Sequence, residues 1–137
     1  MNVTDGGYRE IEHTADWELE VWGPDIATLL VQAARGMYGL MGVDLVSGER
    51  IERRLELEAD DPEDLLVDFL GELLFLLESE GIAFDELGLK VDGRRLWARL
   101  EGGPVAARRK EIKAVTYHRL EVQKGDRGWQ TRVVFDV

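Results

Sequence analysis

Cysteine is absent from the 137-residue sequence, and serine and histidine are scarce. Without cysteine the chain can form no disulfide, no thiolate zinc site and no cysteine nucleophile. The two serines, Ser47 and Ser79, do not stand in the context of a nucleophile elbow, which disfavours a covalent hydrolase. The sequence also lacks a Walker loop, a Rossmann glycine pattern and a paired-histidine zinc helix, so it gives no support to nucleotide or zinc sites of those kinds.

Long apolar runs are missing as well. No stretch approaches the roughly 18 residues that a membrane span needs, and the N-terminus lacks the basic-then-apolar layout of a signal peptide. We therefore expect no membrane association and a cytoplasmic location. The length and the hydrophobic fraction of 45% are those of one domain with one core, so residues 1–137 are treated as a single unit.

Acidic residues dominate what is present. There are 28 Asp and Glu against 17 Lys and Arg, which gives a formal net charge of −11. Proteins that bind nucleic acid neutralise phosphates with clustered Lys and Arg, so stable direct nucleic-acid binding is disfavoured. Cations and proteins with a basic surface are the favoured partners, although the charge is equally consistent with solubility alone.

Alternating patterns predict strands in the first half of the chain. Residues 8–13 alternate loosely, and residues 17–21 alternate strictly between apolar and acidic side chains, with 14–16 as the connection between them. Residues 50–59 also alternate between apolar and charged side chains, with Arg53 as a breach of the pattern. Each pattern is typical of a half-buried strand with one polar face.

Two amphipathic helices are predicted between and after these strands. Apolar residues recur at helical spacing over residues 26–41, and a wide apolar face runs over residues 62–80. Asp60 or Asp61 is a suitable N-cap for the second helix, and Gly81 is a natural stop.

Hairpins are predicted in the second half of the chain. Residues 83–91 and 95–101 are expected to pair through a tight turn at Asp92-Gly93, and the glycines and proline of residues 102–104 are expected to end the second strand.

The last third is predicted to contain a second hairpin. Residues 120–123 and 129–135 should pair around residues 124–128, and residues 111–118 are interpreted as a short helix or turn. The predicted fold class is α+β, with two layers in which the two amphipathic helices pack on one face of a mixed β-sheet.

The carboxylates at the two ends of the sequence form the candidate site. If the last strand lies beside one of the first two, Asp16 and Asp136 could converge with the terminal carboxylate of Val137. Two such charges about 4 Å apart repel by about 4 kcal/mol at an effective dielectric near 20, so the cluster requires a cation, a proton or a basic side chain. Lys113 and His118 are candidates for the last role. Hard oxygen ligands suit Ca²⁺, Mg²⁺ or Mn²⁺.

Structural roles for the same residues remain open from spacing alone. Asp16 could cap a turn, His13 could be a hydrogen-bonded residue at a strand end, and Lys113 could be a solvated surface charge.

Four separated motifs resemble the archease family. They are E-H-T-A-D at residues 12–16, D-L-L-V-D-F-L at 64–70, E-I-K-A-V-T-Y-H at 111–118 and the terminal V-V-F-D-V. The resemblance spans nearly the whole chain. This sequence departs from the family pattern at Glu12, where Asp is frequent, and at Gly71, where a polar residue, commonly Asn, is usual.

The resemblance implies a small α+β protein that is not itself an enzyme and that activates the RNA ligase of tRNA splicing. Such activators promote transfer of GMP from GTP onto the ligase and permit multiple turnover, with GTP handled on the ligase. The resemblance also implies a divalent-metal site, with calcium preferred over magnesium or manganese, held by Asp16, Asp136 and Val137. The further functional positions are Lys113, His13 and His118.

Two other functions are compatible with the same residues. One is a metal-dependent phosphohydrolase that uses these carboxylates, which the shortage of general-base candidates argues against. The other is a chaperone-like module whose acidic face binds a partner without any metal.

Overall fold

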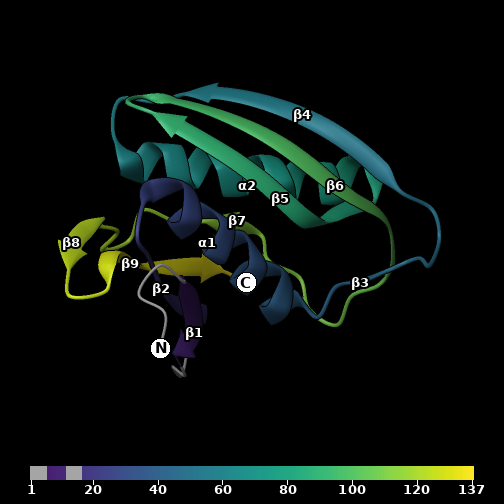
Figure 1. The fold of residues 1–137 in the computed structure, drawn as a ribbon. Coiled ribbons are helices and arrows are strands. Elements are labelled where there is room, and N and C mark those ends of the chain that lie inside the picture. Colours follow the sequence, from purple (N-terminus) through teal and green to yellow (C-terminus); the bar gives the residue numbers. More distant parts are fainter. Residues whose placement is uncertain (1–5, 12–16) are drawn as a thin grey trace.

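The computed structural model describes residues 6–11 and 17–137, and these residues contain two helices and nine strands (Figure 1). In chain order the elements are β1 (Gly7–Ile11), β2 (Trp17–Gly23), α1 (Ile26–Met41), β3 (Asp44–Leu45), β4 (Ile51–Glu58), α2 (Pro62–Glu80), β5 (Ile82–Asp92), β6 (Arg95–Ala107), β7 (Ala114–Val115), β8 (Gln123–Gly125) and β9 (Gly128–Asp136).

Both helices begin and end where the sequence predicts, because their end signals are local. Asp25 caps α1 by accepting a hydrogen bond from the backbone N–H of Thr28 at 2.7 Å. Asp61 caps α2 by accepting from the N–H of Asp64, also at 2.7 Å. Gly81 ends α2 in the left-handed region with φ of 67°, a conformation that glycine adopts without steric cost.

The strands form two sheets. One has the order β1-β2-β9-β7, with β8 also paired to β9, and the other has β6 between β4 and β5, with β3 on the far end of β6. Every strand pair among the described residues is antiparallel.

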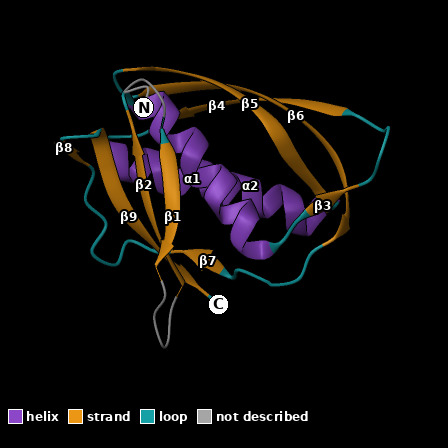
Figure 2. Cartoon of the chain, turned by 60° about the horizontal axis from the view of Figure 1, so that its bottom comes forward, coloured by secondary structure: helices purple, strands orange, loops and turns teal. Residues whose placement is uncertain are grey.

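The α+β class is confirmed, but the single mixed sheet and the two-layer arrangement are not what the chain forms. Both helices lie between the two sheets (Figures 1 and 2). Helix α1 contacts β1, β2 and β9 on one side and β5 on the other, while α2 contacts β7 on one side and β4 and β5 on the other. An alternating pattern shows that a strand has a buried face, but it does not specify the partner strand, so the division into two sheets was not predictable from it.

Strand β6 continues past the point where glycine and proline were expected to end it. A Cβ added at Gly102 would lie 1.9 Å from the carbonyl oxygen of Ala83, and one at Gly103 would lie 2.6 Å from that of Glu49. These glycines therefore allow neighbouring backbone to approach a continuing strand. Pro104 has no N–H to donate, but its carbonyl oxygen accepts a hydrogen bond from the N–H of Val46 at 2.8 Å, so the strand stays paired there.

The segment 111–118 contains no helix. Ala114 and Val115 form β7, which pairs with β9, and the N–H of Thr116 donates to the carbonyl oxygen of Val134 at 3.0 Å. The expected turn lies at the end of this segment, where the N–H of Leu120 donates to the carbonyl oxygen of Tyr117. Ile112 and Val115 fit helical spacing while Val115 and Tyr117 fit strand spacing, and the segment forms a strand because an edge of β9 is available.

Both predicted hairpins are present, but the first strand of the second one was predicted at residues 120–123 and lies at Gln123–Gly125. Strands β5 and β6 pair from Asp92↔Arg95 onward, with Gly93 at φ of 59° in the turn. Strands β8 and β9 close the second hairpin, and their pairing begins at Gly125↔Gly128.

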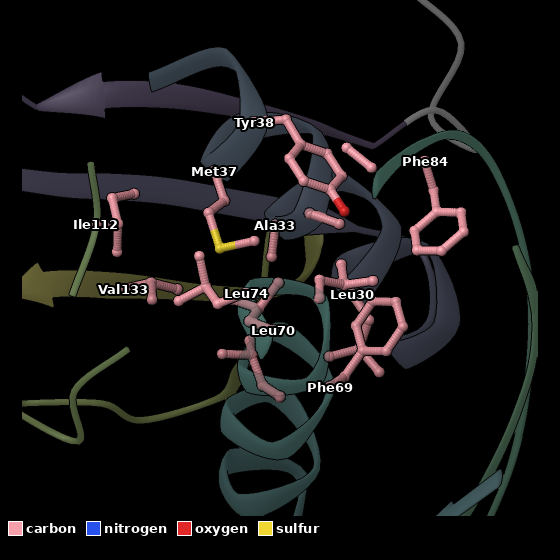
Figure 3. Close-up of a cluster of buried hydrophobic side chains, with 14 of the residues drawn as sticks. Leu30, Ala33, Met37, Tyr38, Phe69, Leu70, Leu74, Phe84, Ile112 and Val133 are labelled. Atoms are coloured by element: carbon pink, nitrogen blue, oxygen red, sulfur yellow. The ribbon is translucent and has the colours of Figure 1, made fainter. Parts of the chain in front are cut away.

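The core lies between the helices and the two sheets (Figure 3). Its fully buried side chains come from both helices and from strands of both sheets, so it links the two sheets through the helices. The largest are Phe69, Phe135, Leu19, Leu29, Leu30, Met37, Met41, Leu66, Leu70, Leu73, Leu96 and Leu100. Neither described helix is long and apolar enough to cross a membrane.

Two phenylalanines on α2 provide a matched test of this packing. Phe69 is 0% exposed and Phe75 is 62% exposed. Phe69→Ala should lower the free energy of unfolding by about 3 to 5 kcal/mol because it leaves a cavity in the core. Phe75→Ala should change it by no more than about 0.5 kcal/mol. Denaturant unfolding of both variants checks this, and equal losses would contradict the assigned burial.

Candidate functional site

The pairing of β2 with β9 brings the beginning of one strand beside the end of the other. Trp17, the first residue of β2, lies opposite Phe135, and Asp136 follows as the last residue of β9. The expected adjacency of the last strand and an early strand is therefore found. Asp136 is exposed, and Val137 is 40% exposed. His13 and Asp16, two of the predicted site residues, lie outside the described residues.

Lys113 lies directly beside the end of β9. Its backbone N–H donates to the carbonyl oxygen of Asp136 at 2.8 Å, and the next residue, Ala114, pairs with Asp136 in the sheet. Ile112, 2% exposed, anchors the segment in the core. The structure thus brings Lys113 and Asp136 together, and the Lys113 side chain is exposed.

His118 lies in the turn after β7, beside an earlier stretch of β9 than Lys113 does. Its backbone N–H donates to Oγ1 of Thr116 at 3.3 Å, and its Nε2 accepts from Nε of Arg119 at 3.2 Å. Thr116 Oγ1 in turn donates to the carbonyl oxygen of Val134. These contacts place the turn around His118 two residues back along β9 from Asp136.

Lys110 is a basic residue at this site that was missing from the sequence prediction. Its Nζ lies 4.5 Å from the ring centroid of Trp17, and its backbone N–H donates to the carbonyl oxygen of Met41. A cation over an indole ring is attracted by the electron-rich face. The only sequence signal was its position three residues before Lys113.

The first turns of α2 carry carboxylates that contact the segment after β7. Glu63 accepts a hydrogen bond from the backbone N–H of Val122 at 2.6 Å. The Tyr117 hydroxyl donates to the Asp64 carboxylate, and this contact, with burial and the nearby charges, raises the pKa of Tyr117 to about 12. Burial and the neighbouring Asp64 charge raise the pKa of Asp68. These contacts hold residues 116–122 against the helix.

The described residues include two of the three predicted metal ligands, Asp136 and Val137. Asp136 and Val137 offer exposed hard oxygen atoms of the kind that Ca²⁺ binds. No group of three or more acidic or histidine side chains suited to a metal occurs within residues 6–11 and 17–137. The predicted ligand set therefore depends on Asp16.

Comparison with known proteins assigns the chain to a family. The model of the Archease protein family (MTH1598/TM1083) matches residues 8–137. The chain belongs to the archease family. Among its relatives, the archease of Archaeoglobus fulgidus is 38% identical over 137 residues, covering 95% of this chain and 98% of that protein. The archease of Methanopyrus kandleri is 34% identical, covering 95% and 99%.

Solved structures of similar sequence have the same fold. The solution structure of protein 1598 from Methanobacterium thermoautotrophicum matches with a TM-score of 0.76 at 32% identity, covering 96% of this chain and 99% of that one. The crystal structure of an archease from Thermotoga maritima, described as a possible chaperone, matches with a TM-score of 0.71 at 28% identity, covering 94% and 96%. The archease resemblance of the four sequence motifs is thereby confirmed.

The contact between Tyr117 and Asp64 has a defined pH dependence. Because the folded-state pKa lies above the ordinary value of 10.0, the contact stabilises the fold fully below pH 10.0, and this contribution is lost as the pH rises to about 12. Asp64→Asn should return the pKa of Tyr117 toward 10.0, as measured by phenolate absorbance against pH.

Asp68→Asn is the matched control for this titration. Asp68 acts on Tyr117 only through its charge, so its replacement should lower the pKa of Tyr117 less than Asp64→Asn does. Equal effects of the two variants would contradict the hydrogen bond.

Proposed function

We propose that this protein activates the RNA ligase that joins tRNA exon halves in the cytoplasm. It promotes guanylylation of the ligase by GTP and permits multiple turnover, with a divalent-metal carboxylate site formed by Asp16, Asp136 and Val137. The protein is a non-catalytic partner of the ligase catalytic subunit, and GTP is handled on that subunit.

Family membership over residues 8–137 carries this proposal, since ligase activation is what the archease motifs imply. The geometry is compatible with it. Trp17, the neighbour of Asp16 in the chain, pairs with Phe135, the neighbour of Asp136. The motif at residues 111–118 meets the last motif through the hydrogen bond between Lys113 and Asp136.

The carboxylates have a specific task in this mechanism. Asp136 and Val137 present oxygen atoms at an exposed strand end, where they can enter a basic pocket of the partner. A divalent ion bound there would neutralise the carboxylates and orient the GTP phosphates. Lys113, whose backbone is fixed to Asp136, supplies a positive charge beside the same strand end.

The net charge of −11 fits an activator that contacts a protein rather than RNA. Repulsion between acidic side chains and phosphates disfavours tRNA binding by this chain alone. The RNA is therefore held by the ligase, and binding of the activator favours the guanylylation-competent conformation of the ligase.

The direct test measures formation of the ligase–GMP adduct and multiple-turnover sealing. Asp16→Ala and Asp136→Asn should each lower stimulation by about 10-fold or more. Loss of a residue that only supports a metal ligand already lowers metal affinity or activity by about 10- to 100-fold. Chelation of divalent ions followed by their stepwise return, with calcium, magnesium and manganese compared, tests the metal requirement.

Val46→Ala is the matched control, because Val46 is exposed directly after β3, where its N–H bonds to Pro104 of β6 in the other sheet, and its replacement should leave stimulation unchanged. Circular dichroism establishes that each variant is folded. Full stimulation by folded Asp16→Ala and Asp136→Asn would remove these residues from the mechanism.

A chaperone-like role is the second candidate, because the similar Thermotoga maritima protein is described as a possible chaperone. In that role the partner would stay bound and soluble while chelation and both substitutions had no effect. Hydrolysis of a phosphate ester by the purified protein alone, lost on chelation, would instead indicate a phosphohydrolase.

A further inference from the structure

A groove lies between α2 and β7, beside the candidate site. It has a volume of about 420 Å³ and is lined by Val67, Gly71, Leu74, Phe75, Glu78, Ile112, Lys113, Ala114 and Val115. One wall is the face of α2 that carries Gly71 and Phe75, and the other is the segment leading into β7. Most of the lining side chains are apolar.

The helix wall of the groove exposes a large apolar side chain next to a residue without a side chain. Phe75 is 62% exposed, the highest value among the exposed large hydrophobic side chains of the described residues. Gly71 lies one helical turn before it, and a Cβ added there would meet nothing within 4 Å. Glycine in the interior of a helix is less favourable than alanine, and no contact within the described chain requires it here.

The charges of the groove are unequal. Glu78 is paired with Arg108, and this guanidinium lowers the pKa of Glu78. Lys113 has no ion pair among the described residues, and its ammonium group adds a positive charge to the lining of the groove. An apolar surface beside an ammonium group is complementary to an apolar side chain that lies next to a carboxylate.

The groove is continuous with the candidate metal site. Lys113 lines the groove with its side chain, and its backbone N–H donates to the carbonyl oxygen of Asp136 at 2.8 Å. A protein that receives Asp136 in its active site would therefore extend over β7 and the groove. Because the groove adjoins Asp136, the protein that binds at Asp136 is the one expected to cover the groove.

We infer that the groove between α2 and β7 is a docking site for the partner protein of the proposed function, through a segment that presents an apolar side chain beside a carboxylate. The apolar side chain lies over Gly71 and against Phe75, and the carboxylate faces Lys113. This inference rests on the proposed function for the identity of the occupant. The groove sets the affinity of the complex, whereas Asp16 and Asp136 act in the activation step.

The test compares Gly71→Trp with Gly71→Ala. Both substitutions place a Cβ in open space, but only the indole fills the groove. Calorimetric titration against the purified ligase catalytic subunit should show affinity at least about tenfold weaker for Gly71→Trp, as expected for loss of a central interface contact, and unchanged for Gly71→Ala.

Phe75→Asp and Lys113→Met test the two parts of the occupant separately. Phe75→Asp should weaken binding to a similar extent, while Val46→Asp, an exposed apolar residue outside the groove, should not. Lys113→Met should weaken binding at low salt and reduce the dependence of affinity on salt, because it removes one charge pair. Unchanged thermal unfolding midpoints establish that the variants are folded.

The stimulation assay separates this inference from the proposed function. For Gly71→Trp, the concentration needed for half-maximal stimulation should rise while the maximal stimulation is preserved. For Asp136→Asn, the maximal stimulation should fall. Wild-type affinity for the ligase in Gly71→Trp would overturn the docking site and leave the proposed function intact.

Two further outcomes count against the docking site. If the wild-type protein neither binds nor stimulates the ligase, both proposals fail. If sedimentation shows that Gly71→Trp disrupts self-association instead of ligase binding, a second copy of this chain is the occupant and the inference is wrong.

Discussion

Strands β2 and β9 pair antiparallel from Trp17↔Phe135 to Gly23↔Trp129, and this pairing connects the first and last parts of the described chain. It places Leu19 beside Val133 on the face that packs against α1. It also leaves the other edge of β9 available, so that β7 and β8 can add to it. Without this pairing neither the first sheet nor the candidate site at its end could form.

The two helices connect the first sheet to the second by packing against strands of both. Both helices lie between the sheets (Figure 2). Helix α2 therefore buries side chains on a wide arc that includes Leu66, Phe69 and Leu73. The arc does not extend to Gly71 and Phe75, which face the groove beside β7. The same helix therefore supplies the core with one side and offers an apolar surface to a partner with another.

Predictions from local signals were accurate. Asp25 and Asp61 each accept a hydrogen bond from the backbone N–H three residues later in the chain, which sets the first turn of each helix. Gly81 ends α2 because it adopts positive φ. Predictions that required distant partners were less accurate. Gly102 was interpreted as the end of a strand, but it lies within a strand at a point where the backbone of Ala83 approaches closely. The segment after Glu111 was interpreted as a helix or turn, but part of it forms a strand because β9 lies beside it.

The sequence by itself determined the helices, most strands, the archease family and the choice of Asp136 and Lys113 as site candidates. These follow from short-range hydrogen bonding, from the period of apolar residues and from motif identity. The tertiary structure alone decided that the strands form two sheets and that Lys113 is fixed to Asp136. It also showed that Lys110 covers Trp17 and that Gly71 opens a groove. These features depend on contacts between residues far apart in the chain. Such contacts form only when the chain folds, so local sequence patterns do not specify them.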